Sequence, residues 1–233
     1  MAPSTTQQAV EGIERYIRDH GLRRGDVLPS ETTLCEELDC SRSSVREAMR
    51  TLQSLDIVEI RRGQGTFIST MSMSPLVRGM VLRVTLDTQN SASHLLEVVA
   101  TREALESSLA RELVEVHTPE TLGELLSVVA NMRSSFEDHG NFAKEDRQFH
   151  ALLLEPTSNT LIRELSDALW QIHDQTVPTL NLDVSADYER TIEFHADMVR
   201  ALDARDVEAF RHAVHQHYLP LRELVAKLEN SDT

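Results

Sequence analysis

The fold of the first part of the chain is decided by the stretch Leu28-Pro-Ser-Glu-Thr-Thr-Leu-Cys-Glu-Glu-Leu-Asp-Cys-Ser-Arg-Ser-Ser-Val-Arg-Glu-Ala-Met-Arg50. Ser30 is a typical helix N-cap, and the apolar residues that follow begin a stripe at i, i+4 spacing with Leu34. Turn and cap formers occupy positions 39–41. Beyond them apolar residues recur at i, i+3, i+4 and i+7 from Val45 onward. The stretch therefore predicts two short helices joined by a tight turn, which is a helix-turn-helix.

The outer face of the second predicted helix is basic. Arg42, Ser43 and Arg46 lie in its first turns, and the two arginines are four residues apart on one face. Helix-turn-helix proteins present these turns to base edges, where Arg can donate two hydrogen bonds to guanine or can bind phosphate. The alternative is an ordinary solvated face, and these residues alone do not separate the two interpretations.

A two-stranded wing is predicted directly after the helix-turn-helix. Residues 57–61 and 66–69 have strand composition, and residues 62–65 between them form a turn. Gly63 allows a positive φ and a close approach of backbone to phosphate, while Arg62 places a positive charge at the tip. The combination of helix-turn-helix and wing favours contact with DNA over a solvated basic face.

Three motifs in this order resemble the signature of GntR-type transcriptional regulators. They are Gly25-Asp-x-Leu-Pro-Ser-Glu31, Ser41-Arg-x-x-Val-Arg-Glu-Ala48 and Gly63-x-Gly-Thr-Phe67, and the resemblance covers about residues 7–70. It departs from the family at Asp39, where a turn glycine is usual, and at Thr32, where many members carry a basic residue. The resemblance implies contacts with a double-stranded DNA operator from Arg42, Ser43, Arg46, Arg62 and Gly63.

The charge of the chain is unevenly distributed. The 233 residues carry a net charge of −15, yet residues 1–70 hold nine Arg and no Lys against eleven Asp and Glu, which leaves −13 for the remainder. Such an acidic body argues against general nucleic-acid binding and favours one specific site on the near-neutral head. The sequence also lacks a run of 18 apolar residues and a signal peptide, so we expect a cytoplasmic protein with no membrane partner.

The chain is long enough for two domains. We expect a winged helix-turn-helix domain at 1–70, a linker at 71–75 and an all-helical domain at 76–230 that binds an effector and dimerises. The fold class is therefore mainly α, with an all-α bundle after the winged head. The helices expected from periodicity lie at about 7–20 in the head and then at 75–88, 92–116, 119–138, 141–154, 159–177, 186–203 and 206–229.

One carboxylate and three imidazoles in the predicted bundle could hold a metal ion. Asp146 and His150 lie four residues apart on one predicted helix, and His195 and His217 come from two later helices. This donor set suits zinc first, with nickel or manganese as alternatives. The chain has ten histidines, however, and a lone histidine is more often a surface or core residue than a ligand.

A second resemblance supports the metal interpretation. Glu97-x-x-x-x-Arg102-x-x-x-Glu106, Asp146-x-x-Phe-His150, Ser158-Asn159, His195, Asp206 and His217 resemble the FCD effector domain of FadR-like GntR regulators. The resemblance implies metal ligation by Asp146, His150, His195 and His217 and effector binding by Arg102, with Asn159 as a weaker candidate. An intrahelical ion pair of Arg102 with Glu106 is the structural alternative, and Trp170 and His173 could line the pocket or simply pack.

These observations predict a transcriptional regulator, expected to be a repressor, that forms a homodimer on a palindromic operator and responds to a small organic acid. One alternative is a metal-dependent enzyme, but no base motif, nucleophile elbow or phosphate loop accompanies the histidines, so we expect no catalytic residues. The other alternative is a direct metal sensor without an organic ligand. Arg102 argues against it, because a buried arginine suits a carboxylate.

Overall fold

The computed structural model describes residues 5–87, 90–180 and 188–231. The chain divides into two compact units, Met1–Pro75 and Leu76–Thr233. The first unit combines a helical cluster with a small antiparallel sheet, and the second is helical throughout the part that is described. The predicted class, a mainly α protein with a winged helix-turn-helix and an all-α bundle, is confirmed.

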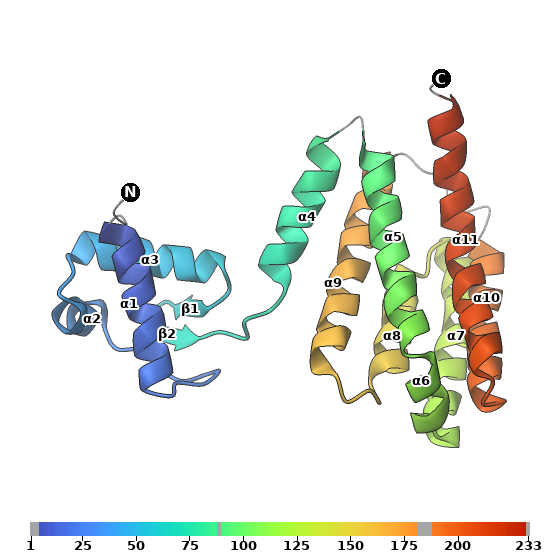
Figure 1. The fold of residues 1–233 in the computed structure, drawn as a ribbon, viewed down its shortest axis with the longest axis horizontal. Helices are drawn as coiled ribbons and strands as arrows, with labels where there is room; N and C mark the ends of the chain where they lie inside the picture. Colours follow the sequence, from blue (N-terminus) through green and yellow to red (C-terminus); the bar gives the residue numbers. More distant parts are fainter. Residues whose placement is uncertain (1–4, 88–89, 181–187, 232–233) are drawn as a thin grey trace. The chain divides into compact units, whose positions relative to one another are not determined.

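The first unit is built from three helices and a two-stranded wing (Figure 1). The wing strands pair Val58 with Ile68 and Arg61 with Gly65. Apolar residues from all three helices and both strands form one core, which contains Ile13, Leu34 and Leu52. The elements are α1 (Thr5–Asp19), α2 (Glu31–Leu38), α3 (Arg42–Ser54), β1 (Val58–Arg61) and β2 (Gly65–Ile68).

The turn between α2 and α3 explains why this sequence forms a helix-turn-helix. The side chain of Ser30 accepts a hydrogen bond from the Thr33 amide at the start of α2, and Ser41 caps α3 by accepting from the Ser44 amide. Asp39 ends α2 with a φ of 49°, in the left-handed region. Asp tolerates this conformation better than most residues, so it can occupy a position where glycine is usual.

Asp56 ties the end of the wing to the segment that follows it. Its carboxylate accepts hydrogen bonds from Ser69 Oγ at 2.6 Å, Thr70 Oγ1 at 3.2 Å and the Ser72 amide at 2.8 Å. The bonds from Ser69 and Ser72 lower the pKa of Asp56 from 3.8 to about 2. The first residues of the predicted linker are thereby attached to the winged unit.

The second unit is a helical bundle (Figure 1). Helix α10 packs against α7 and α11, α5 packs against α9 and α11, and α8 packs against α7 and α9. The elements are α4 (Ser74–Leu86), α5 (Ser91–Ser108), α6 (Ala110–Val116), α7 (Pro119–His139), α8 (Ala143–Leu154), α9 (Thr160–Thr176), the 3-10 helix η1 (Val177–Leu180), α10 (Tyr188–Asp203) and α11 (Val207–Ser231).

Most helix bounds in the bundle lie within two residues of those expected, but the helix predicted at 92–116 is two helices. Leu109 separates them with φ −88° and ψ −2°, and its amide bonds to Glu106 O at 3.2 Å, which tightens the last turn of α5. Periodicity did not reveal this break, because apolar residues continue through it. Helix α4 begins at Ser74, inside the predicted linker, and residues 186–187 of another predicted helix lie outside the described residues.

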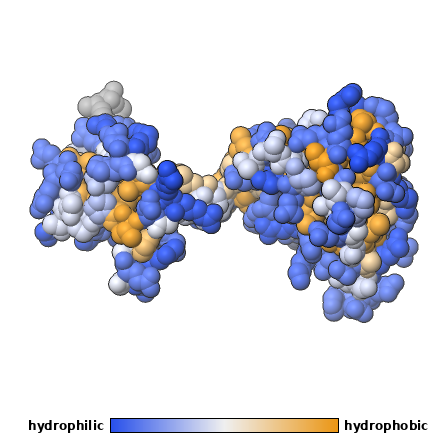
Figure 2. Space-filling view, turned by 90° about the horizontal axis from the view of Figure 1, so that it is seen from below, coloured by the Kyte–Doolittle hydropathy of each residue, from blue (hydrophilic) through white to orange (hydrophobic). Residues whose placement is uncertain are grey.

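Hydrophilic residues cover much of the visible face of each unit, with apolar residues scattered between them (Figure 2). Within the described ranges, no helix combines the length and the apolar character that a transmembrane span requires. The apolar side chains are instead concentrated in the two cores.

Candidate functional site

Helix α3 separates an apolar face from a basic one. Arg42, Ser43 and Arg46 are exposed, while Val45 and Ala48 on the opposite face are fully buried in the core of the first unit. Arg46 Nη2 lies 3.4 Å from Glu31 Oε2, a distance that holds the guanidinium only weakly. Arg42 forms no hydrogen bond or ion pair with any residue that the structure describes. The face predicted for DNA contact is therefore accessible at the start of α3.

The wing tip offers a second accessible cation. Gly63 has a φ of 74°, a conformation that L side chains rarely adopt. Arg61 is already bound to Glu59 at 2.8 Å and stacks over the Phe67 ring at 4.4 Å. Arg62 is exposed and has no partner among the described residues, so it remains available for phosphate.

The four predicted metal ligands come together inside the bundle. Asp146 and His150 lie on α8, His195 lies on α10 and His217 lies on α11. One ligand atom from each lies within 4.8 Å of every other, and all three imidazoles are buried. The sequence places the residues on three separate helices, and the packing of those helices gathers them at one point.

Two of the imidazoles have Nδ1 close to an oxygen atom. His195 Nδ1 lies 2.8 Å from the Thr191 carbonyl oxygen, and His150 Nδ1 lies 2.8 Å from Glu106 Oε1. On both rings Nδ1 therefore faces an oxygen that can accept a hydrogen bond. The Nε2 atoms of His195 and His150 face Asp146 Oδ1 at 3.0 and 3.8 Å. A proton on Nδ1 leaves the Nε2 lone pair for a metal ion, which is the tautomer that a metal ligand needs.

The protonation of the cluster also suits a divalent ion. Burial opposes ionisation of Asp146, but the close contact with His195 and the nearby His150 hold its pKa well below the ordinary value. Burial is the main cause that lowers the pKa of His217 well below its ordinary value, and the neighbouring His195 and His150 lower it further, so this ring is neutral. Both ring nitrogens of His150, together with His195 Nε2 and His217 Nδ1, are buried without a hydrogen-bond partner. Three imidazole nitrogens and one carboxylate oxygen are a donor set that fits a metal such as zinc.

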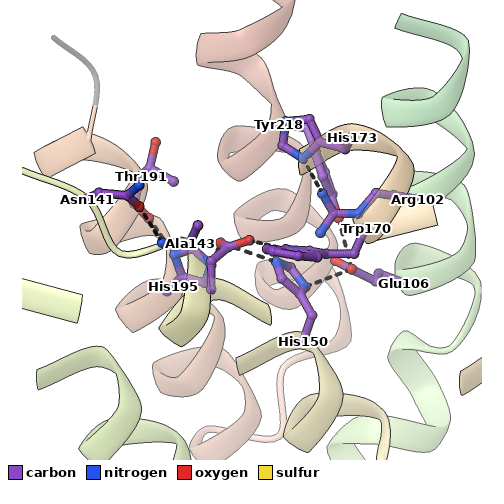
Figure 3. A network of polar contacts seen from close by, with 11 residues as sticks. Arg102, Glu106, Asn141, Ala143, His150, Trp170, His173, Thr191, His195 and Tyr218 are labelled. Carbon is purple, nitrogen blue, oxygen red and sulfur yellow. Dashed lines mark hydrogen bonds and ion pairs between the residues drawn. The ribbon is translucent and has the colours of Figure 1, made fainter. Parts of the chain in front are cut away.

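Two further residues, Glu106 and Trp170, contact the side chains of the predicted metal ligands (Figure 3). Glu106 is fully buried on α5, and the same Oε1 that faces His150 also accepts the Tyr218 hydroxyl at 2.8 Å. Burial opposes ionisation of Glu106, but His150 lowers its pKa. Trp170 Nε1 donates to Asp146 Oδ2. The i, i+4 spacing predicts for Glu106 only a possible ion pair with Arg102, and nothing in that spacing indicates these contacts.

A cavity of about 210 Å³ lies beside the cluster and is lined by Asp146 and His217 at one side. Arg102 also lines it, although its side chain is only 1% exposed. Arg102 Nη1 lies 3.0 Å from His173 Nδ1, and its guanidinium carbon lies 5.2 Å from the Tyr218 ring centroid. Burial and Arg102 lower the pKa of His173 to about 3, so His173 is neutral and can accept from Arg102.

The remaining predicted site residues divide between the cavity and its surroundings. Trp170 and His173 line the cavity. Asn159 does not, because its side chain caps α9 by accepting from the Ile162 amide at 3.2 Å. The intrahelical ion pair of Arg102 with Glu106 is not formed. Arg102 instead bonds to His173, and its Nε and Nη2 have no partner.

Comparison with known families supports both units. Residues 97–219 match the family model of the FCD domain, and residues 5–68 match that of bacterial regulatory proteins, gntR family. Together the two matches span the winged unit and most of the bundle, including every residue of the metal-ligand cluster and Arg102.

Individual relatives agree with these matches. The chain is 26% identical to an uncharacterized HTH-type transcriptional regulator, YcbG, of Bacillus subtilis, covering 95% of this chain and 90% of that one. It is 24% identical to the galactonate operon transcriptional repressor of Escherichia coli, covering 91% and 93%. Among solved structures, Streptococcus agalactiae GntR superposes with a TM-score of 0.64 at 25% identity, covering 94% of this chain and 99% of that one. These relatives are named as regulators and not as enzymes.

Proposed function

Because the chain belongs to the GntR family of transcriptional regulators and carries its FCD domain, we propose that it is a repressor whose affinity for its operator is controlled by a small carboxylate. Regulation of transcription through DNA binding follows from the family itself. The carboxylate, the metal ion beside it and the direction of regulation are our inference.

The observation that carries the proposal is the environment of Arg102. Its guanidinium is almost fully buried, yet Nε and Nη2 have no hydrogen-bond partner and the side chain lines the cavity. An unpaired buried cation is costly, and an arginine fork matches the two oxygens of a carboxylate. A small organic acid in the cavity would satisfy both nitrogens.

A divalent metal ion would bind the other end of the same acid. Asp146, His150, His195 and His217 would hold the ion, zinc first, and it would supply a second positive centre next to the cavity. The acid would then bridge the ion and Arg102. Because two of the ligands lie on α10 and α11 and the others on α8, an acid bound here would bias how these helices pack.

The same proposal assigns the DNA contacts and the oligomeric state. Arg42, Ser43 and Arg46 on α3 would meet base edges and phosphates in a major groove, and Arg62 with Gly63 at the wing tip would meet the adjacent backbone. Two copies of the chain would bind the two halves of a palindromic operator. Repression is favoured because relatives such as the galactonate operon protein are named repressors.

Titration of the metal-loaded protein with a panel of hydroxy acids and sugar acids tests the proposal. Operator duplexes selected from a random pool report DNA affinity by fluorescence anisotropy, and calorimetry reports acid binding. An effector should shift DNA affinity by about 5–150-fold, which corresponds to 1–3 kcal/mol of coupling, and DNA should weaken acid binding by the same factor.

Two variants make the test specific. Arg102→Met keeps the buried stem but removes the cation, and it should abolish the response to the acid while sparing operator binding. Arg111→Ala, which removes an exposed arginine of α6, should respond normally. If no acid changes DNA affinity while metal alone does, the protein is a direct metal sensor and the proposal is wrong.

A further inference from the structure

The wall of the cavity is divided between one cationic group and a largely apolar surface. Of the described residues that line it, Arg102 is the sole arginine or lysine. Much of the remaining wall is apolar or aromatic and comes from the N-cap of α8 and from α9, η1, α10 and α11. It includes Phe142, Trp170, Val177, Tyr188, Leu221 and Leu224.

Several polar groups in the wall are already engaged. Asn141 Oδ1 accepts from the Ala143 amide at 2.7 Å, and the Tyr218 hydroxyl donates to Glu106. Trp170 Nε1 donates to Asp146, and His173 Nδ1 bonds to Arg102. A ligand rich in hydroxyl groups would lose its hydrogen bonds to water here and would find few free partners in exchange.

The charge of the wall argues against a second carboxylate. Asp174, an exposed residue of α9, also lines the cavity. A dicarboxylate whose first carboxylate binds Arg102 would bring its second carboxylate to a wall that has no further arginine or lysine among its described residues. That wall also carries another acidic residue, Asp174. Like charges at such separations repel, and burial strengthens the repulsion.

We propose that the cavity selects monocarboxylates with an apolar tail over sugar acids and over dicarboxylates. The carboxylate lies against Arg102 and the tail lies against Val177, Leu221 and Leu224. The size of the cavity sets the length of the tail. A cavity of 150 Å³ accommodates benzene, so 210 Å³ corresponds to about eight non-hydrogen atoms, as in hexanoate. This inference rests on the proposed function, because it takes the acid-binding role of Arg102 as given.

Calorimetry of the full chain, loaded with zinc, tests the inference with three six-carbon acids. Hexanoate should bind at least about tenfold more tightly than gluconate, which has the same carbon chain with five hydroxyl groups, and than adipate, which adds a second carboxylate. In the series acetate, butyrate and hexanoate, affinity should rise by up to about fourfold per methylene, the factor for full burial of that group. Hexanol should not bind measurably, because it lacks the carboxylate.

Two near-isosteric variants distinguish an effect on the cavity wall from a general effect on the fold. Val177→Thr introduces a hydroxyl into the apolar wall and should weaken hexanoate by about three- to tenfold without weakening gluconate. Val207→Thr makes the same change at the start of α11, outside the cavity, and should leave both affinities unchanged.

The outcomes are distinguishable. If gluconate or adipate binds more tightly than hexanoate and loses its affinity in Arg102→Met, the selectivity inferred here is wrong and the proposed function stands. If none of the acids binds and none alters operator affinity, the proposed function fails, and this inference fails with it.

Discussion

Replacement of Glu106 tests whether a buried carboxylate on α5 controls metal affinity through His150. One oxygen of Glu106, Oε1, faces both His150 Nδ1 and the Tyr218 hydroxyl at 2.8 Å, while Oε2 is buried without a hydrogen-bond partner. Glu106→Gln can therefore keep an acceptor oxygen at the same place and loses only the negative charge. Glu106→Leu removes the acceptor and leaves His150 free to change its tautomer.

Glu106→Leu should weaken zinc binding more than Glu106→Gln. Loss of a residue that contacts and orients a metal-ligating histidine weakens metal binding by about 10–100-fold, which is about 1.4–2.7 kcal/mol. We expect zinc affinity to fall by about tenfold in Glu106→Gln and by about 100-fold in Glu106→Leu. Zinc affinity is measured by competition with a chromophoric chelator, and circular dichroism with thermal melting checks that each variant folds.

Tyr218→Phe is the matched control. It removes the other group that bonds to Glu106 Oε1 and leaves the contact with His150 in place, so zinc affinity should stay within about threefold of the unaltered chain. A folded Glu106→Leu variant that binds zinc as tightly as the unaltered chain would refute the reasoning, because His150 would then hold its orientation without Glu106.

Three other predictions concern DNA, pH and metal removal. Arg42→Ala and Arg46→Ala should each weaken operator binding. If the side chain reads a guanine, the loss should be about 1–3 kcal/mol with relaxed preference at one base pair, whereas a phosphate contact would weaken binding equally for all sequences. Unchanged anisotropy titrations for both variants would contradict this prediction. Asp56 has a folded pKa of about 2 against 3.8, so its stabilisation is present above about pH 4 and is lost as the pH falls towards 2. Asp56→Asn should therefore cost about 1 kcal/mol at pH 7, a value reduced for solvent screening of a partly exposed carboxylate, and the difference in urea unfolding should vanish near pH 2. Removal of metal by a chelator should lower the melting temperature by several degrees, because an ion at 100 times its Kd contributes about 2.7 kcal/mol; identical melting curves with and without chelator would show that no ion stabilises the bundle.

The winged unit could be predicted from the sequence almost element by element because its signals are local. Ser30 and Ser41 cap the two helices of the motif, and the glycines of the wing turn permit positive φ. Each of these features depends on residues that lie within a few positions of one another. The sequence pattern therefore carries the same information as the fold.

The site in the bundle could be predicted only in part, because it is assembled from distant helices. The ligand residues were indicated by residue type and by the resemblance, since Asp146 and His150 share one helix face. The contacts of Glu106 with His150 and Tyr218 depend on the packing of α5 against α11 and on the position of α8. Burial of Arg102 is likewise a tertiary property, and the i, i+4 spacing from Glu106 also allowed an ion pair along one helix, which is not formed.

The charges buried around the cavity suggest an order for the two binding events. Arg102 contributes one positive charge, and the carboxylates of Glu106 and Asp146, whose pKa values lie below their ordinary values, contribute two negative ones. When the imidazoles are counted as neutral, which is the form that a metal ligand needs, the empty site carries −1, a divalent ion changes it to +1, and a monocarboxylate then brings it to zero. The metal-free site should therefore repel the acid, and acid binding should require the ion. Calorimetry with hexanoate before and after chelation measures this dependence directly. Equal affinity in the two states would mean that Arg102 binds the acid alone and that the cluster has a separate role.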